Sequence, residues 1–232
     1  MKNEKQVYLQ FLSRFKKGNF SNKKKFVDFF STASDWNIYV LGIRLFMAIC
    51  SHSDMEMLVS FLSRCSDEQL RVFLAYVPES LTIQAIPFLL ALYEDRKGAC
   101  IRQDIARCIY EILGCKYDEK RSYDINELGD LCISFLQVKD PSKYYFKGKT
   151  YFTGDMTKEI ISMVIYCRAK SLKFLSDQIP SILSHETGIM CPIRQNTDIN
   201  SDAISQIYGY VNVIAKQQHI RGSKYFYNHI IV

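Results

Sequence analysis

The chain carries few residues whose types and spacing would support catalysis or metal binding. Its four histidines, none of which has a partner at the spacing of a metal site, are His52, His185, His219 and His229. The adjacent His185 and Glu186 would do acid–base chemistry only with a third group that the fold brings near. The sequence also lacks a Gly-x-Ser-x-Gly elbow and a phosphate-cradling glycine loop. We therefore predict no catalytic residue, no metal, no cofactor and no enzyme activity.

The cysteines indicate a reducing compartment. There are eight, spread through the chain without a Cys-x-x-Cys pair: Cys50, Cys65, Cys100, Cys108, Cys115, Cys132, Cys167 and Cys191. Several fall on the apolar faces of predicted helices, where free cysteine behaves as a small buried hydrophobe. This distribution is unlike a disulfide scaffold or a zinc site. We expect reduced, largely buried thiols in a cytoplasmic protein.

The stretch "KYYFKGKTYFTG", residues 143–154, interleaves five aromatic residues with three lysines. Strand-forming residues flank Gly148-Lys149, and a glycine in the first position of a two-residue loop predicts a type II′ hairpin. Successive strand side chains point to opposite faces, so we expect Tyr144 and Phe146 to be buried and Tyr145 to be exposed between lysines. The predicted partner-binding residues are Lys143, Tyr145, Lys147, Lys149 and Tyr151.

Three interpretations of this hairpin stay open at the level of sequence. It is a packed joint between helical segments, a contact surface for a protein partner, or a platform for nucleic acid. The absence of arginine and of any known nucleic-acid motif makes the third the least favoured.

Basic charge is concentrated at the N-terminus. The net charge is +6, and residues 1–30 hold eight basic and two acidic side chains, which leaves the remainder neutral. Within this segment Tyr8, Phe11, Leu12 and Phe15 form an apolar stripe. A basic amphipathic helix of this kind either lies on an anionic membrane or caps a helical array, and we favour the cap. The neutral remainder argues against a nucleic-acid-binding groove.

The elements that must position these residues are mostly helices. Apolar residues recur with helical period in six stripes between residues 36 and 136, then over residues 160–175 and 204–214. Ser53 with Glu56 and Ser66 with Gln69 fit capping boxes, and Gly114 fits a helix end. We predict a mostly α fold with one small hairpin, either a HEAT-like α-solenoid or an irregular helical array.

The same pattern predicts the organisation of the chain. Residues 1–138 form an N-terminal helical array, and residues 139–232 form the hairpin and a C-terminal helical part of the same continuous domain. The segment "HETGIMCPIRQNTD" reads as a loop, and the aromatic end "RGSKYFYNHIIV" as a terminal strand or a tail packed in the core. No apolar run approaches the roughly 20 residues that span a bilayer, and no secretory signal is apparent.

Three segments carry a family resemblance. The run "TIQAIPFLLALYEDRKGACIRQDIARCIYEIL", the loop "SHETGIMCPI" and the ending "GSKYFYNHII" resemble the all-helical, HEAT-like immunity proteins of bacterial polymorphic toxin systems, which include contact-dependent growth inhibition. The resemblance implies a cytoplasmic protein that binds and blocks one cognate toxin domain and is not an enzyme. The alternatives are a HEAT-like nucleic-acid-binding or DNA-repair protein and a helical scaffold.

Overall fold

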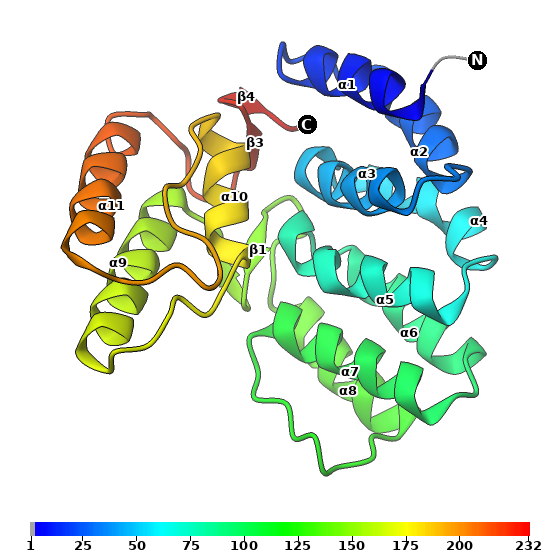
Figure 1. The fold of residues 1–232 in the computed structure, drawn as a ribbon. Helices are drawn as coiled ribbons and strands as arrows, with labels where there is room; N and C mark the ends of the chain where they lie inside the picture. Colours follow the sequence, from blue (N-terminus) through cyan, green and yellow to red (C-terminus); the bar gives the residue numbers. More distant parts are fainter. Residues whose placement is uncertain (1–2) are drawn as a thin grey trace.

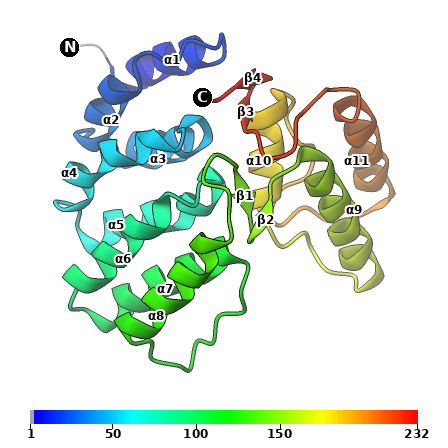
Figure 2. The same ribbon diagram turned by 180° about the vertical axis from the view of Figure 1, so that it is seen from behind.

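The protein is an array of short helices with two small hairpins (Figures 1 and 2). The computed structural model describes residues 3–232, except for the side chain of Ser60. The α-helices of these residues are α1 (Glu4–Phe15), α2 (Lys23–Ser31), α3 (Trp36–Ile49), α4 (Val59–Leu62), α5 (Asp67–Tyr76), α6 (Ala85–Asp95), α7 (Ala99–Leu113), α8 (Ile125–Gln137), α9 (Thr153–Ala169), α10 (Gln178–Thr187) and α11 (Ser201–Ile214). The other elements are the 3-10 helices η1 (Ser53–Leu58) and η2 (Val77–Ser80), and the antiparallel hairpins β1 (Tyr145–Phe146) with β2 (Lys149–Thr150) and β3 (Tyr225–Phe226) with β4 (His229–Ile230). The prediction of a mostly α fold is confirmed.

Helices α1 to α8 form a column of two layers. In one layer α1 contacts α3, α3 contacts α5, and α5 contacts α7, while α6 contacts α8 in the other. Helices α9, α10 and α11 form a second group beside this column, and the C-terminal end of the chain lies near α1 (Figure 1). The layering is what a HEAT-like array requires, and the HEAT-like repeat itself stays a prediction. Among the described residues, no helix has both the length and the apolar character needed to cross a bilayer.

Local signals placed several helix ends correctly. Ser66 and Gln69 form the predicted capping box at α5, in which the Gln69 amide donates to Ser66 Oγ and the Ser66 amide donates to Gln69 Oε1. Gly114 ends α7 in the left-handed conformation, with φ of 70°. The second predicted box does not form, because Ser53 begins a 3-10 helix that has no side-chain cap.

The buried side chains form two hydrophobic cores. The first lies within the α1–α8 column, and the second is built by α9, α10 and α11. The β1–β2 hairpin lies between them, because Tyr145 belongs to the first core while Tyr144 and Phe146 belong to the second. Neighbouring side chains of one strand therefore tie the two cores together.

The predicted hairpin exists, but its turn lies one residue earlier than expected. Phe146 pairs with Lys149, so the two-residue loop is Lys147-Gly148 and not Gly148-Lys149. Both loop residues have positive φ, 46° and 73°, which is the type I′ geometry and not type II′. The unfavourable conformation of Lys147 is held by a tertiary contact, in which the Gly148 amide donates to the Ile112 carbonyl at 2.9 Å.

The expectation that Tyr145 is exposed is wrong, and Tyr151, another of the predicted partner-binding residues, is buried as well. Tyr145 is 5% exposed, and its hydroxyl accepts from the Asp140 amide and donates to the Asp140 carbonyl. Tyr151 is 1% exposed. The alternation of side chains was predicted correctly, but a hairpin between two cores buries both of its faces.

The C-terminal segment forms a second hairpin that the sequence did not predict. Tyr225 pairs with Ile230 and Phe226 with His229, around a turn at Tyr227 and Asn228 whose φ values are 51° and 63°. The segment predicted as a loop from residue 185 is also corrected, since α10 continues to Thr187 before the chain leaves the helix.

Candidate functional site

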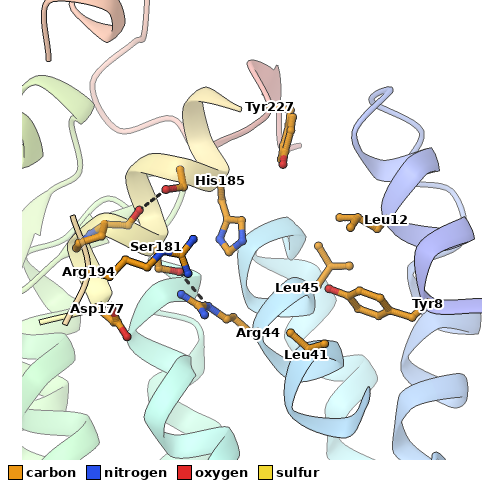
Figure 3. Close-up of a pocket in the computed structure, with 12 residues that line it drawn as sticks. Tyr8, Leu12, Leu41, Arg44, Leu45, Asp177, Ser181, His185, Arg194 and Tyr227 are labelled. Carbon is orange, nitrogen blue, oxygen red and sulfur yellow. Dashed lines mark hydrogen bonds between the residues drawn. The ribbon is translucent and has the colours of Figure 1, made fainter. Parts of the chain in front are cut away.

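A cleft of about 170 Å³ opens where the helical column meets the second group (Figure 3). It is lined by side chains of α1, α3 and α10, by the loop that follows α10, and by the turn of the β3–β4 hairpin. Figure 3 shows Arg44, His185 and Arg194 directed into this space, with the hydroxyl groups of Tyr8 and Tyr227 facing it from the other side. Four chain segments distant in sequence therefore meet here.

The β3–β4 turn is held over the cleft by the end of α10. The amides of Tyr227 and Asn228 donate to the carbonyls of His185 and Glu186 at 2.7 and 2.8 Å. These carbonyls lie in the last turn of α10, where a helix has no partners of its own. Capping by the hairpin thus fixes Tyr227 beside His185.

A buried lysine fixes the same hairpin to α3. Lys224 Nζ donates to the carbonyls of Met47, Cys50 and Ser80 at 2.6, 3.0 and 3.0 Å, and its side chain is 1% exposed. Its ammonium group lies at the C-terminal end of α3, where the helix dipole favours positive charge. Burial lowers the pKa of Lys224, and the neighbouring Cys50 opposes that shift.

The floor of the cleft contains a chain of hydrogen bonds. Arg44 Nε donates to Ser181 Oγ at 3.1 Å, and Ser181 Oγ donates to Glu79 Oε2 at 2.6 Å. Glu79 is 6% exposed, and burial raises its pKa to about 7, although the hydrogen bond from Ser181 and the charge of Arg44 oppose this. These two hydrogen bonds fix the position of the Arg44 guanidinium at the base of the cleft.

The imidazole of His185 is neutral in this environment. Burial lowers its pKa to about 3, and the charges of Arg44, Lys224, Arg194 and Lys16 add to the shift. The adjacent Glu186 is no partner for the ring, because Glu186 Oε2 accepts from the Tyr225 amide at 3.0 Å. A pKa so far below neutrality does not suit a general acid or base at physiological pH.

The predicted partner-binding residues lie elsewhere, around the β1–β2 hairpin. Lys147, Lys149 and Tyr151 border a hollow of about 500 Å³ between this hairpin and α9. Lys147 is paired there, since its ammonium lies 3.1 Å from Glu159 Oε1. Lys143 is half-buried and packs its side chain near Gly222, away from the hollow. The structure therefore gathers three of the five residues and separates Lys143 and Tyr145 from them.

Most of the cleft was not predictable from the sequence. Tyr8, Arg44, Arg194 and Tyr227 come from four distant segments, so no local spacing connects them. One signal was available for the hairpin that carries Tyr227. The run "YFYNHI", residues 225–230, repeats the pattern of "YFKGKT", residues 145–150, with asparagine in place of glycine at the second turn position.

Neither metal ligands nor disulfides build a site in the described part of the chain. No three His, Cys, Asp or Glu side chains gather there in a way that would hold a metal ion. All eight cysteines are free. Six are buried, as expected, and Cys100 and Cys115 are exposed.

Comparison with known families identifies the chain. No curated protein and no solved structure matches it. The model of one family, immunity protein 47, matches residues 1–231. A match over almost the whole length agrees with the resemblance found in the sequence, and this mostly α chain belongs to the immunity protein 47 family.

Proposed function

We propose that the protein neutralises one cognate toxin domain by binding it in a one-to-one complex in the cytoplasm of the producing cell. The observation that carries this proposal is the family match over residues 1–231, because immunity proteins protect cells from the toxins of polymorphic systems. We assign the protein and its toxin to a system of the contact-dependent growth inhibition type.

Binding without catalysis is the mechanism that this structure supports best. The one imidazole in the cleft has a pKa of about 3 and lacks a carboxylate partner among the described residues. A preformed surface, by contrast, needs only shape and charge complementarity to occlude a toxin active site or an exosite. An interface of ordinary size buries about 800 Å² on each partner, so it would extend well beyond one cleft.

The proposal treats the chain as one continuous domain with a HEAT-like array at residues 1–138. Support comes from the β1–β2 hairpin, whose neighbouring side chains enter both cores, and from Lys224, which joins the C-terminal hairpin to α3. A rigid scaffold of this kind holds an interface in its binding conformation before the toxin arrives, which lowers the entropic cost of association.

We propose different roles for the five predicted partner-binding residues of the β1–β2 hairpin. Lys147 and Lys149 are exposed and stay candidates for direct toxin contact, and Lys143 is half-buried. Tyr145 and Tyr151 are buried, so we assign them the task of positioning the lysines.

The test begins with the neighbouring gene, because we expect a large secreted toxin to be encoded directly upstream. The toxin domain is expressed from an inducible promoter in bacteria with and without this protein, and the two tagged proteins are copurified. We expect growth to be restored and a stable complex to be recovered. Continued killing by a toxin domain that shows no binding would overturn the proposal.

A further inference from the structure

We propose that the cleft between α1, α3, α10 and the β3–β4 turn is an anchor site for a carboxylate side chain of a protein partner. The partner is taken to be the toxin domain, so this inference rests on the proposed function. The cleft gathers hydrogen-bond donors that the protein itself leaves unused, beside apolar walls that suit a short aliphatic stem.

The unused donors come from four side chains. Arg44 Nε donates a hydrogen bond to Ser181 Oγ, and neither of the terminal nitrogens of Arg44 makes a hydrogen bond with any described residue. Within residues 3–232, the hydroxyl groups of Tyr8 and Tyr227 and the guanidinium of Arg194 also have no hydrogen-bond partner. Four donor groups that face one space without an acceptor form a site for an acceptor supplied from outside.

The charge of the cleft favours an anion. Four positive charges lie close enough to the cleft to lower the pKa of His185: those of Arg44, Arg194, Lys16 and Lys224. Asp177 is the carboxylate that lines the cleft, and its Oδ1 already accepts from the Gln195 amide at 2.8 Å. Positive charge therefore exceeds negative charge around the space, and an incoming carboxylate would restore the balance.

The shape of the cleft favours a side chain over a nucleic-acid backbone. Leu12, Leu41, Leu45 and Pro180 supply apolar wall, and the space is about 170 Å³. A water molecule occupies about 30 Å³ of liquid, so the cleft holds a few waters or one short side chain. An aspartate or glutamate would place its methylene groups on the leucines and its carboxylate against Arg44, where a guanidinium can donate two parallel hydrogen bonds.

The hydroxyl of Tyr8 adds to this assignment. Burial raises its pKa to about 12, so Tyr8 remains a protonated donor at physiological pH. His185 is neutral and presents one donor and one acceptor nitrogen. The cleft thus offers charged and neutral donors together, as sites that recognise carboxylates do.

The first arm of the test needs no toxin. The full-length protein is titrated with acetate while the imidazole resonances of His185, assigned with a His185→Gln variant, are followed by NMR. We expect a saturable shift that weakens about tenfold in Arg194→Gln and in Tyr8→Phe combined with Tyr227→Phe, since each loses donors to the anion. Arg14→Gln, which removes the same charge from an exposed site outside the cleft, should bind acetate like the wild type.

Other anions separate the possible sources of charge in the same arm. Inorganic phosphate or a short single-stranded oligonucleotide that binds more tightly than acetate, and displaces it, would overturn the carboxylate assignment. Equal acetate binding by the wild type and the cleft variants would overturn the site altogether. Arg194 is exposed and has no side-chain hydrogen bond in the described structure, so Arg194→Gln tests the site without disturbing the fold.

The second arm uses the toxin domain encoded beside this gene. We expect the wild type and Arg14→Gln to bind it equally, and Arg194→Gln and the double tyrosine variant to bind at least tenfold more weakly. Equal binding by all four proteins would overturn the anchor and leave the proposed function standing. If the wild type does not bind the toxin, the proposed function fails, and the acetate arm alone decides whether the site exists.

Discussion

Replacing Lys224 with methionine tests how the C-terminal hairpin is held. Methionine keeps the length and apolar character of the lysine stem but removes the ammonium. The carbonyls of Met47, Cys50 and Ser80 then lose a donor at 2.6 to 3.0 Å in a site that excludes water. A buried acceptor without a partner costs about 1–3 kcal/mol.

The expected loss of stability is smaller than the sum of three such costs. Lys224 itself loses hydration on folding, as its lowered pKa indicates, and the variant no longer has to bury a charge. We therefore expect Lys224→Met to lower the free energy of unfolding by about 3–5 kcal/mol, which lowers the Tm of a chain of this size by roughly 10 °C. Against a total stability of about 5–15 kcal/mol, this is a large fraction.

The assay is urea unfolding followed by circular dichroism, with Lys149→Met as the matched control. Lys149 is exposed in the other hairpin, so its replacement should change stability by less than about 0.5 kcal/mol. If Lys224→Met were as stable as the control, the ammonium would not be the cap of α3, and the account of how the hairpin is fixed would be refuted.

Four further predictions concern other parts of the molecule. Glu79 has a folded pKa of about 7 against an ordinary value of 4.5, so its contribution to stability is present below pH 4.5 and is lost as pH rises to 7. The free energy of unfolding of Glu79→Gln should therefore equal that of the wild type near pH 4.5 and exceed it by about 3 kcal/mol at pH 8. A difference that does not change with pH in urea unfolding would contradict this. Tyr145→Ala should cost about 3–5 kcal/mol and Tyr145→Phe about 1–2 kcal/mol in the same assay, whereas a fully stable alanine variant would mean that the side chain is not buried. Deletion of residues 1–30 should lower the Tm by more than about 5 °C, because it removes Phe30, whose ring centre lies 6.2 Å from that of Phe46 and 6.0 Å from that of Phe61 in the retained core. An unchanged Tm would count against the cap. Thiol titration should find Cys100 and Cys115 reactive in the native protein and all eight cysteines after denaturation, and fewer than eight would indicate disulfides.

The helical part of the fold was predictable because its signals are local. The capping box of Ser66 and Gln69 and the left-handed Gly114 depend only on residues within one turn, and both were placed correctly. Helix α10 was missed because Pro180 interrupts its short apolar pattern. Proline is tolerated there, since it lies in the first turn, where its missing amide hydrogen has no helical partner to lose.

Local sequence signals predicted the β1–β2 hairpin only in part. A lysine at positive φ is unfavourable, so the sequence rule placed glycine first in the turn, yet Lys147 adopts φ of 46°. The hydrogen bond from the Gly148 amide to Ile112 compensates, and it depends on a helix that ends more than 30 residues earlier. The burial of Tyr145 has the same origin, because its exposure was decided by a second core that the strand alone does not reveal.

The cleft depends still more on tertiary structure. Tyr8, Arg44, Arg194 and Tyr227 carry no mutual spacing in the sequence. The apolar stripe that contains Tyr8 and the aromatic C-terminal run that contains Tyr227 do not indicate a shared site. Only the layering of α1 on α3 and the capping of α10 by the second hairpin bring them together. Net charge was also misleading here, because it drew attention to residues 1–30 and away from Arg44 and Arg194.

The most direct test of the central claim is a titration of toxin activity with the purified protein. The toxin domain of the neighbouring gene is held at a concentration far above the expected dissociation constant, and its activity is measured as the protein is added. Neutralisation by binding predicts a linear fall to zero at one molar equivalent, with activity recovered when the complex is dissociated. Activity that persists past several equivalents would contradict neutralisation, and lasting inactivation by a small fraction of one equivalent would show that the protein acts as an enzyme.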